Sequence, residues 1–390
     1  MFWFWFWWTM LVLDGLWWLL VMRWTKRTLW RVLISVFISA QMAVLLSLIS
    51  ELLDSHVYPK AILVAVVLWH RIVLPLALGV LAVVAIVRFR ARRKNLRADP
   101  AEVNSQTRRE FIGACAAVVP SLFTIGVTGA TLAQLRQVRV RRFILSMPTL
   151  PRALDGTTIA HVSDMHVGRW TCGPILREMI NKTNALRPDL VLFTGDLIDY
   201  ELADLGEAIA TIKAMQGRYG QWMIEGNHDL LQDGAEFGRR VKAAGVPLLL
   251  DDSTVADVRG HPIQFFGLRW MGFGRGAEDD RHRDRLTAMQ MRLMLKQRQP
   301  DAFPILLAHH PHALDVAAKA DLPLILAGHT HGGQWMLNPR LGVGPLWFRY
   351  WSGLYSRGRS QMIVSNGVGN VFPLRVNAPA EIIHITLRRA

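Results

Sequence analysis

The chain has 390 residues, 51% of them hydrophobic, and a formal net charge of +15 at pH 7, from 45 Lys and Arg against 30 Asp and Glu. A basic chain can bind nucleic acid, but much of this excess lies in short loops beside apolar stretches, where positive charge fixes membrane topology. We therefore expect no nucleic-acid partner. The two cysteines, Cys115 and Cys172, fall in different parts of the chain and exclude a disulfide framework.

Four apolar stretches occupy the first third of the chain, at about residues 2–22, 33–53, 61–87 and 111–135. An apolar helix of about 20 residues can cross the hydrocarbon core of a bilayer, so residues 1–135 are predicted to be a transmembrane region. The loops after the first and third stretches are basic, and placing both in the cytoplasm puts the N-terminus and the rest of the chain outside. The opposite orientation is favoured by Arg136, Arg139, Arg141 and Arg142, which follow the fourth stretch.

Three ionisable residues, Asp14, His70 and Arg71, interrupt the apolar stretches. Such residues can mark a transport or ligand site, but with only three of them we expect interfacial placement or mutual pairing. The six tryptophans before residue 19 are expected to anchor the helix at the membrane interface.

The segment Thr107-Arg108-Arg109-Glu110-Phe111-Ile112 resembles a twin-arginine export signal, a route that carries folded and often metal-loaded proteins. It departs from that pattern at Gly113, where lysine is common. The alternative is that the arginines mark the cytoplasmic end of the last helix, and both interpretations give the same topology.

Five motifs follow in the rest of the chain, each at the end of an apolar run: "TTIAHVSDMH", "DLVLFTGD", "QWMIEGNHD", "FPILLAHHPH" and "LPLILAGHTHGG". The apolar runs are typical of buried strands, and helix-like stretches lie between them at 173–185, 203–217, 284–298 and 313–320. This alternation predicts an α/β fold. A lone Gly-Asp is usually a turn, but the five motifs together are specific.

Side chains at the carboxyl ends of strands converge in one crevice in α/β folds, so the Asp, His and Asn residues of these motifs are expected to lie together. A mixed set of oxygen and imidazole ligands suits divalent ions such as Mn, Fe or Zn. The motifs therefore predict a metal centre.

In this order the motifs resemble the calcineurin-like metallophosphoesterase superfamily, over about residues 142–390. The resemblance implies a four-layer α-β-β-α sandwich after the transmembrane region. It also extends to the C-terminal segment 350–387, which is similar to a subgroup with membrane or twin-arginine N-termini. The resemblance implies two divalent metal ions: the first held by Asp164, His166 and His331, the second by Asn227, His309 and His329, and both bridged by Asp196.

The resemblance further implies that a hydroxide between the two ions attacks the phosphorus while His228 protonates the leaving oxygen as general acid. Asp229 would orient the His228 imidazole. We expect His310 and His312 to be loop residues and His161 to be structural. Residues 268–285 are a candidate cap over the site, and the aromatic-rich segment 344–355 either rims the site, touches lipid or is ordinary packing.

The expected function is a membrane-anchored phosphoesterase that hydrolyses phosphodiester or pyrophosphate bonds. Its catalytic domain would lie on the outer, periplasmic face of the inner membrane, with membrane lipids and a lipid-linked or envelope phosphate ester as partners. The alternatives are a cytoplasm-facing UDP-sugar-lipid pyrophosphatase, a nuclease, a non-catalytic receptor and a transporter. Every expected ligand is present, which argues against the receptor, and few polar residues line the helices, which argues against transport.

Overall fold

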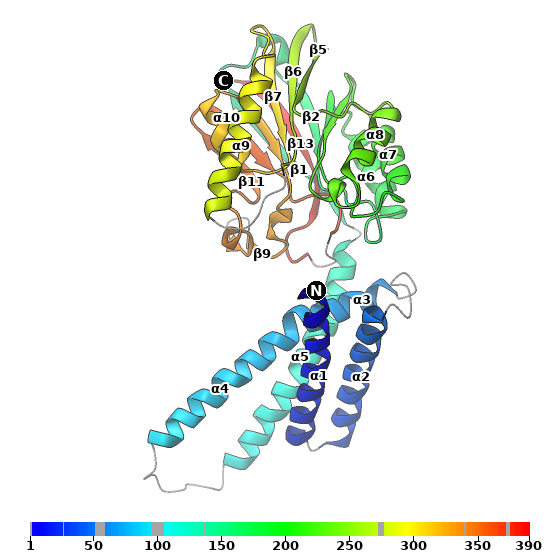
Figure 1. The fold of residues 1–390 in the computed structure, drawn as a ribbon, viewed down its shortest axis with the longest axis vertical. Coiled ribbons are helices and arrows are strands. Elements are labelled where there is room, and N and C mark those ends of the chain that lie inside the picture. Colours follow the sequence, from blue (N-terminus) through cyan, green and yellow to red (C-terminus); the bar gives the residue numbers. More distant parts are fainter. Residues whose placement is uncertain are drawn as a thin grey trace. The chain divides into compact units, whose positions relative to one another are not determined.

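The computed structural model describes residues 2–25, 27–50, 59–94, 105–135, 137–271, 277–338, 341–371 and 375–390. The chain divides into two compact units, Met1–Ala133 and Gln134–Ala390 (Figure 1).

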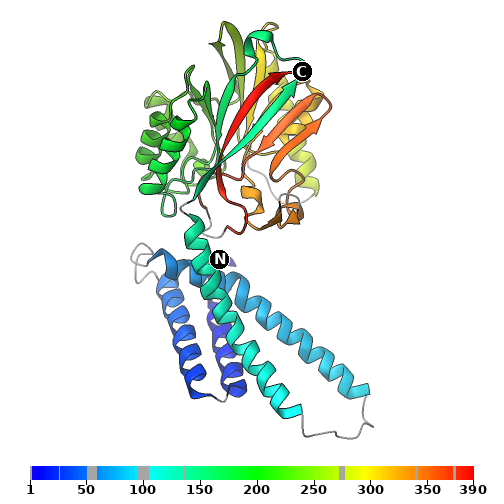
Figure 2. The ribbon, with the colours of Figure 1, turned by 180° about the vertical axis from the view of Figure 1, so that it is seen from behind.

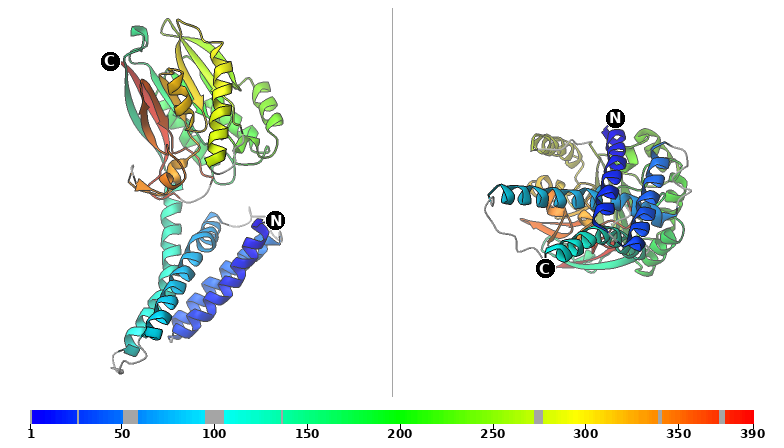
Figure 3. Two further views of the ribbon diagram at one scale, coloured as in Figure 1. Left: turned by 60° about the vertical axis from the view of Figure 1, so that its left-hand side comes forward. Right: turned by 90° about the horizontal axis from the view of Figure 1, so that it is seen from below.

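The first unit is built from helices. They are α1 (Phe2–Trp24), α2 (Thr28–Ile49), α3 (Lys60–Leu68), the π-helix η2 (Trp69–Val73), α4 (Leu74–Lys94) and α5 (Ser105–Leu135). Helices α1 and α2 lie side by side, as the blue ribbons of Figure 3 show. They bury small patches such as Met10 against Leu45 and leave large apolar side chains such as Trp5 and Val36 exposed. Such an exposed apolar surface suits lipid rather than water.

Within the described residues, three helical segments are long and apolar enough to cross a membrane: Trp5–Trp24, Thr28–Ile49 and Lys60–Val87. The third runs without a break through α3, η2 and α4. The fourth predicted crossing lies in helix α5, where Val118–Gln134 is a shorter apolar segment, so its crossing stays a prediction. Residues 51–53, the end of the second predicted stretch, and Arg136 lie outside the described residues.

Two of the ionisable residues of this unit are buried together. The Asp14 carboxylate accepts a hydrogen bond from the Trp69 indole at 2.7 Å and lies 2.7 Å from Nε2 of His70. Nδ1 of His70 lies 2.8 Å from the carbonyl oxygen of Val66. Because a carbonyl can only accept, Nδ1 donates to Val66, and Nε2 faces the Asp14 carboxylate. The pair thus joins α1 to the π-helix. Mutual pairing, one of the two outcomes that we expected, is what these contacts show.

The second unit contains two main sheets. The first has the strand order β1-β13-β2-β3-β4, and the second has the order β11-β12-β8-β7-β6-β5. The strands of the first are β1 (Val138–Met147), β2 (Thr158–Val162), β3 (Leu190–Thr194), β4 (Gln221–Ile224) and β13 (Ala380–Arg389). Those of the second are β5 (Asp252–Val258), β6 (His261–Leu268), β7 (Phe303–Ala308), β8 (Leu324–Ala327), β11 (Gly353–Arg357) and β12 (Ser360–Val364). A two-stranded sheet pairs β9 (Met336–Asn338) with β10 (Leu341–Gly342).

The strands that carry the motifs are parallel within each sheet. Strands β2, β3 and β4 are parallel neighbours in the first sheet, and β6, β7 and β8 are parallel neighbours in the second. Strands β3, β7 and β8 are buried at every residue, which explains why they appear in the sequence as continuous apolar runs. All carboxyl ends in each parallel set therefore lie at one edge of that sheet.

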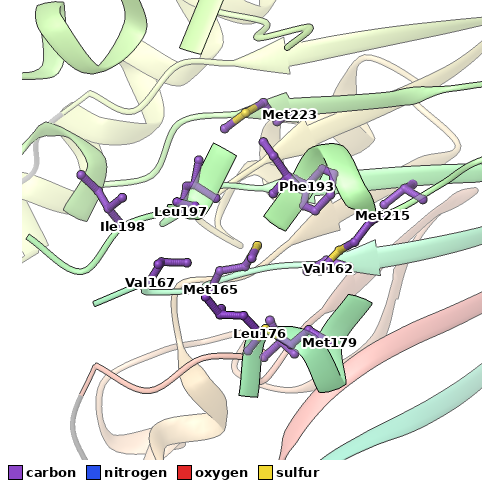
Figure 4. Packing of buried hydrophobic residues seen from close by; sticks show 14 of the residues in the cluster. Val162, Met165, Val167, Leu176, Met179, Phe193, Leu197, Ile198, Met215 and Met223 are labelled. Atoms are coloured by element: carbon purple, nitrogen blue, oxygen red, sulfur yellow. The ribbon is translucent and has the colours of Figure 1, made fainter. Parts of the chain in front are cut away.

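The helices cover the sheets, as Figures 1 and 2 show. Helices α6 (Pro174–Ala185), α7 (Leu205–Ala214) and α8 (Gly234–Ala243) pack on the first sheet, with Met179 and Phe237 in the core that Figure 4 shows in part. Helices α9 (Ala277–Leu295) and α10 (Ala313–Lys319) pack on the second sheet. Between the sheets lies a third apolar core, in which Leu192 and Ile305 are fully buried. The unit is thus a mixed α/β fold with two sheets.

Two of the arginines that follow the apolar part of α5 have partners inside this unit. Arg139 contacts the buried carboxylate of Glu381 at 2.9 Å, and Arg141 lies 3.5 Å from the same carboxylate. Glu381 is fully buried in β13, so it requires positive partners. These arginines are therefore explained by the fold of the second unit without reference to membrane topology.

Candidate active site

The motif residues all lie just beyond the carboxyl ends of parallel strands. Asp164 and His166 follow β2, Asp196 follows β3, Asn227, His228 and Asp229 follow β4, His309 follows β7, and His329 and His331 follow β8. Both sheets therefore contribute to one site. The first sheet provides the carboxylates together with His166, Asn227 and His228, and the second provides His309, His329 and His331.

The first group consists of Asp164, His166 and His331, all buried. Nε2 of His331 lies 3.1 Å from Nε2 of His166 and 3.4 Å from Oδ1 of Asp164. One ligand atom of each residue lies within 4.8 Å of the other two, which is close enough to hold one metal ion.

The second group consists of Asp196, His309 and His329, with Asn227 beside them. Nε2 of His309 lies 3.1 Å from Oδ2 of Asp196 and 3.1 Å from Oδ1 of Asn227. Nδ1 of His329 lies 2.9 Å from the same amide oxygen. Asp196 also lies 3.5 Å from His166, so its carboxylate stands between the two groups.

Backbone groups of one ligand loop orient the side chains of another. The amide of His329 donates to both oxygens of Asp164, at 2.9 and 3.1 Å, and Ser163 Oγ donates to Oδ2 of Asp164 at 2.5 Å. The amide of His228 donates to Oδ1 of Asp196 at 2.8 Å. A Cβ atom at Gly226 would collide with this carboxylate, which explains the glycine of the third motif.

Five of these residues have left-handed backbone conformations: Asp164, His166, Asp196, His329 and His331 have φ between 43° and 72°. Residues other than glycine rarely adopt this region, and each such residue stores roughly 1–3 kcal/mol of strain. The clustering of strained backbone at one site is typical of a functional centre.

The charges of the site depend on one another. Burial raises the pKa of Asp164. Burial also raises the pKa of Asp196, but the charge and hydrogen bond of His309, with His166 and His228, outweigh it and hold that pKa well below its usual range. Burial lowers the pKa of His309, and the charge and hydrogen bond of Asp196 outweigh this and raise it to about 9. In contrast, burial and the charge of His309 lower the pKa of His329 to about 3.

The donor set fits divalent metal ions. Two buried carboxylates, four imidazoles and one amide oxygen converge, and a carboxylate between the two groups has the two oxygens that a bridging ligand needs. An ion ligated by His309 would replace the proton that now balances Asp196, since metal ligation requires the neutral imidazole.

Comparison with known proteins agrees with this geometry. Residues 157–333, which include every residue of the two groups, match the model of the family described as calcineurin-like phosphoesterase. This part of the chain is therefore similar to calcineurin-like phosphoesterases.

Three curated relatives illustrate the range of the match. A transmembrane protein with metallophosphoesterase domain from Danio rerio is 28% identical over 257 residues, covering 62% of this chain and 55% of that protein. The uncharacterized metallophosphoesterase YkuE of Bacillus subtilis is 27% identical over 299 residues, covering 73% of this chain and 99% of that protein. The phosphodiesterase YaeI of Escherichia coli is 24% identical over 236 residues, covering 59% and 81%. The chain thus spans about half the length of the Danio rerio protein.

In the region that matches this family model, a carboxylate that we did not single out from the sequence lies beside His228. The backbone carbonyl of Asp199 lies 2.6 Å from Nδ1 of His228, and Oδ1 of Asp199 lies 3.5 Å from Nδ1 of both His228 and His166. Burial lowers the pKa of His228, but the hydrogen bonds and charges of Asp199, with the charge of Asp196, outweigh it and raise the pKa to about 9.

Asp229, which we expected to orient His228, has other partners. Its Oδ1 accepts hydrogen bonds from the backbone amides of Leu197 and Ile198 at 2.8 and 3.1 Å, and its Oδ2 accepts one from Gly226 at 2.8 Å. These bonds join the loop after β3 to the loop after β4. Asp229 therefore positions the loops that carry Asp196 and Asn227. Asp199, and not Asp229, lies beside the imidazole of His228.

His310 lies beside the second group, with its ring 5.0 Å from the ring of His329. Nδ1 of His310 lies 2.8 Å from Nδ1 of His312, and His161 is buried in β2 with Nε2 2.8 Å from Oγ1 of Thr194. The Trp270 ring, from the predicted cap, lies 5.0 Å from the His329 ring. A small pocket opens here, lined by Trp270, Arg283, Thr287, His309, His310 and His312. It borders the second set of ligands through His309.

Proposed function

We propose that the chain is a membrane-anchored, metal-dependent phosphoesterase that hydrolyses phosphodiester or pyrophosphate bonds. The observation that carries the proposal is the pair of ligand groups on either side of Asp196. The match to the phosphoesterase family supports the reaction type, and the Escherichia coli relative named a phosphodiesterase supports the diester class.

We assign the ligands by their places in the two groups. Asp164, His166 and His331 would hold the first ion, Asn227, His309 and His329 the second, and Asp196 both. Mn, Fe and Zn all suit such a mixed oxygen and imidazole set. When bound, a pair of ions lowers the pKa of water and neutralises charge that grows on the phosphoryl oxygens.

We assign the role of general acid to His228. Its imidazole ring lies 4.6 Å from that of His166 and is partly exposed, so it borders the centre without being enclosed by it. Asp199 holds Nδ1, which leaves Nε2 to donate a proton to the leaving oxygen. Because Asp199 and Asp196 raise the pKa of His228, the imidazole carries that proton at neutral pH.

We further propose that the chain lies in the inner membrane with its phosphoesterase domain on the outer face. Three helical segments of spanning length and a relative named as a transmembrane protein support membrane insertion. The basic loops support this orientation, and the contacts of Arg139 and Arg141 with Glu381 account for two of the four arginines that argue against it. Arg108 and Arg109 would then stand at the cytoplasmic end of α5, as part of a twin-arginine signal or as a topological marker.

The experiment that tests the function is a substrate screen. The purified full chain, loaded in turn with Mn, Fe or Zn, is incubated with phosphomonoesters, phosphodiesters and lipid pyrophosphates. We expect turnover of a diester or a pyrophosphate that disappears in the Asp196→Asn variant. Absence of turnover with every metal and every substrate would exclude the enzyme, and selective turnover of monoesters would exclude the proposed class.

A further inference from the structure

A turn beside the ligand groups presents large apolar side chains to solvent. This apolar turn consists of residues 343–348, around the 3-10 helix η6 (Gly344–Leu346). Leu346 is 77% exposed and Trp347 is 65% exposed, and Leu341 just before the turn is 54% exposed. Neighbouring exposed side chains of this size are unusual on a folded domain and mark a contact surface.

The apolar turn is a rigid structure. The amide of Leu346 donates to the carbonyl of Val343 at 3.0 Å, and the amides of Trp347 and Phe348 donate to the carbonyl of Gly344 at 3.0 and 2.9 Å. The turn rests on Trp351, which is buried with Met336. Leu346 and Trp347 are therefore held outward by a fixed backbone.

The apolar turn adjoins the candidate active site. The Phe348 ring lies 5.7 Å from the ring of His329, a ligand of the second group. A Cβ atom at Gly333, just after the last ligand motif, would collide with the backbone of Gly344. The exposed side chains thus lie at the border of the centre, and the turn that carries them packs against the last ligand loop.

The apolar turn also lies at the end of the second unit where the chain arrives from α5. Strand β1 begins at Val138, which pairs with Ala380. Val376, four residues before Ala380, donates its amide to the carbonyl of Gln334 and accepts from the amide of Met336. Val343, the first residue of the apolar turn, donates to the carbonyl of Trp335, so the turn is joined to this same end of the unit. Only two residues separate the end of α5 from β1, a reach of about 10 Å at most.

We propose that the apolar turn inserts Leu346 and Trp347 into the surface of the bilayer, and that the substrate is a phosphoester of a lipid held in that bilayer. The bilayer is favoured over a protein partner because the same chain has three apolar segments of spanning length, which keep the membrane within reach. Tryptophan beside leucine is the composition that membrane interfaces favour. The lipid substrate rests on the proposed phosphoesterase function, but the membrane contact does not.

The contact is tested with a fluorescent label. In the full chain carrying Cys115→Ser and Cys172→Ser, an environment-sensitive dye is attached to Leu346→Cys or to Val255→Cys as a control. Val255 is 37% exposed on β5, which lies at the opposite end of the unit from β9 (Figure 1). In vesicles with brominated phospholipids, we expect at least twofold stronger quenching at position 346. Equal quenching at the two positions would overturn the membrane contact. Emission that changes with protein concentration would indicate that a second copy of the chain covers the surface, and this result would overturn the membrane contact too.

The substrate is tested by comparing two phosphodiesters, a lipid held in vesicles and a water-soluble one. Leu346→Glu with Trp347→Glu should lower turnover of the lipid about tenfold and leave the soluble substrate within twofold. The control pair, Val255→Glu with Met289→Glu, replaces exposed apolar residues elsewhere and should change neither. Equal losses on both substrates, or none on either, would overturn the lipid substrate. If the unmodified chain hydrolyses neither, the proposed function fails, while the quenching still decides the contact.

Discussion

At the scale of single residues, Asp199 and His228 form the pair that we propose for proton transfer. Asp199→Asn removes a charge that raises the pKa of His228. Its protonated, donating form should therefore be lost at lower pH, and the alkaline limb of the kcat profile should move to lower pH. With a poor leaving group, kcat should fall by about 10²-fold or more, the usual range for a lost general acid.

The matched control is Glu201→Gln, an exposed carboxylate two residues further along the same loop. It should leave the pH profile unchanged. If the Asp199→Asn variant has normal metal content and an unchanged pH profile of kcat, the assignment of this pair is contradicted.

His161 makes the fold sensitive to acid. Burial lowers its pKa to about 3, whereas an unfolded histidine titrates near 6.5. Between these two pKa values the unfolded state binds a proton that the folded state does not bind. The free energy of unfolding therefore has its full value above pH 6.5 and decreases as the pH falls toward 3. Between pH 7.5 and 5 the expected loss is about 2 kcal/mol. Unfolding of His161→Gln should lack this part of the loss, whereas His282→Gln, an exposed histidine, should behave as the unmodified chain.

The convergence of the site residues could be predicted because each candidate ligand lies at a strand end in a recognisable motif. The place of Asp199 could not, since a carboxylate three residues after Asp196 gives no periodic signal and its position depends on how the loop folds. The bonds from the amides of Leu197 and Ile198 to Asp229 could not be predicted from spacing either, because they join two loops across 32 and 31 residues of sequence.

At the scale of elements, the Asp14–His70 pair joins α1 to the π-helix across 56 residues of sequence. Asp14→Leu would leave the His70 and Trp69 donors buried without their acceptor, and should destabilise the first unit by about 1–3 kcal/mol. The double variant Asp14→Leu with His70→Leu should recover stability, because two apolar groups replace the buried pair. Unfolding of the full chain in detergent measures both, and an Asp14→Leu variant as stable as the unmodified chain would exclude a stabilising role.

The helices and parallel strands near the motifs were the predictable elements. The expected helices at 173–185 and 313–320 correspond to α6 and α10, and the apolar runs before the motifs correspond to strands. The antiparallel pairing of β13 with β2, and the parallel pairing of β1 with β13, were not predictable. These pairings join the two ends of the second unit, and nothing in a local pattern of apolar residues specifies such a distant partner.

At the scale of the whole molecule, the chain combines apolar helices with a domain that is similar to phosphoesterases. The composition could predict this division, since the apolar excess ends where β1 begins. The direction in which the active site faces could not be read from motifs, which specify chemistry but not the surface around it. Exposure of Leu346 and Trp347 became visible only in the folded chain, because Trp351 and Tyr355 of the same aromatic-rich segment are packed inside.

Metal titration of the full chain tests the shared centre most directly. The chain is stripped of metal, ions are added back, and bound metal and phosphodiester turnover are measured together. We expect two ions per chain at saturation and turnover that rises as the second ion binds. In Asp196→Asn, both the binding of the second ion and turnover should be lost, since one carboxylate serves both groups. Full turnover without metal would contradict a centre built around Asp196. An Asp196→Asn variant that binds two ions as tightly as the unmodified chain would contradict it as well.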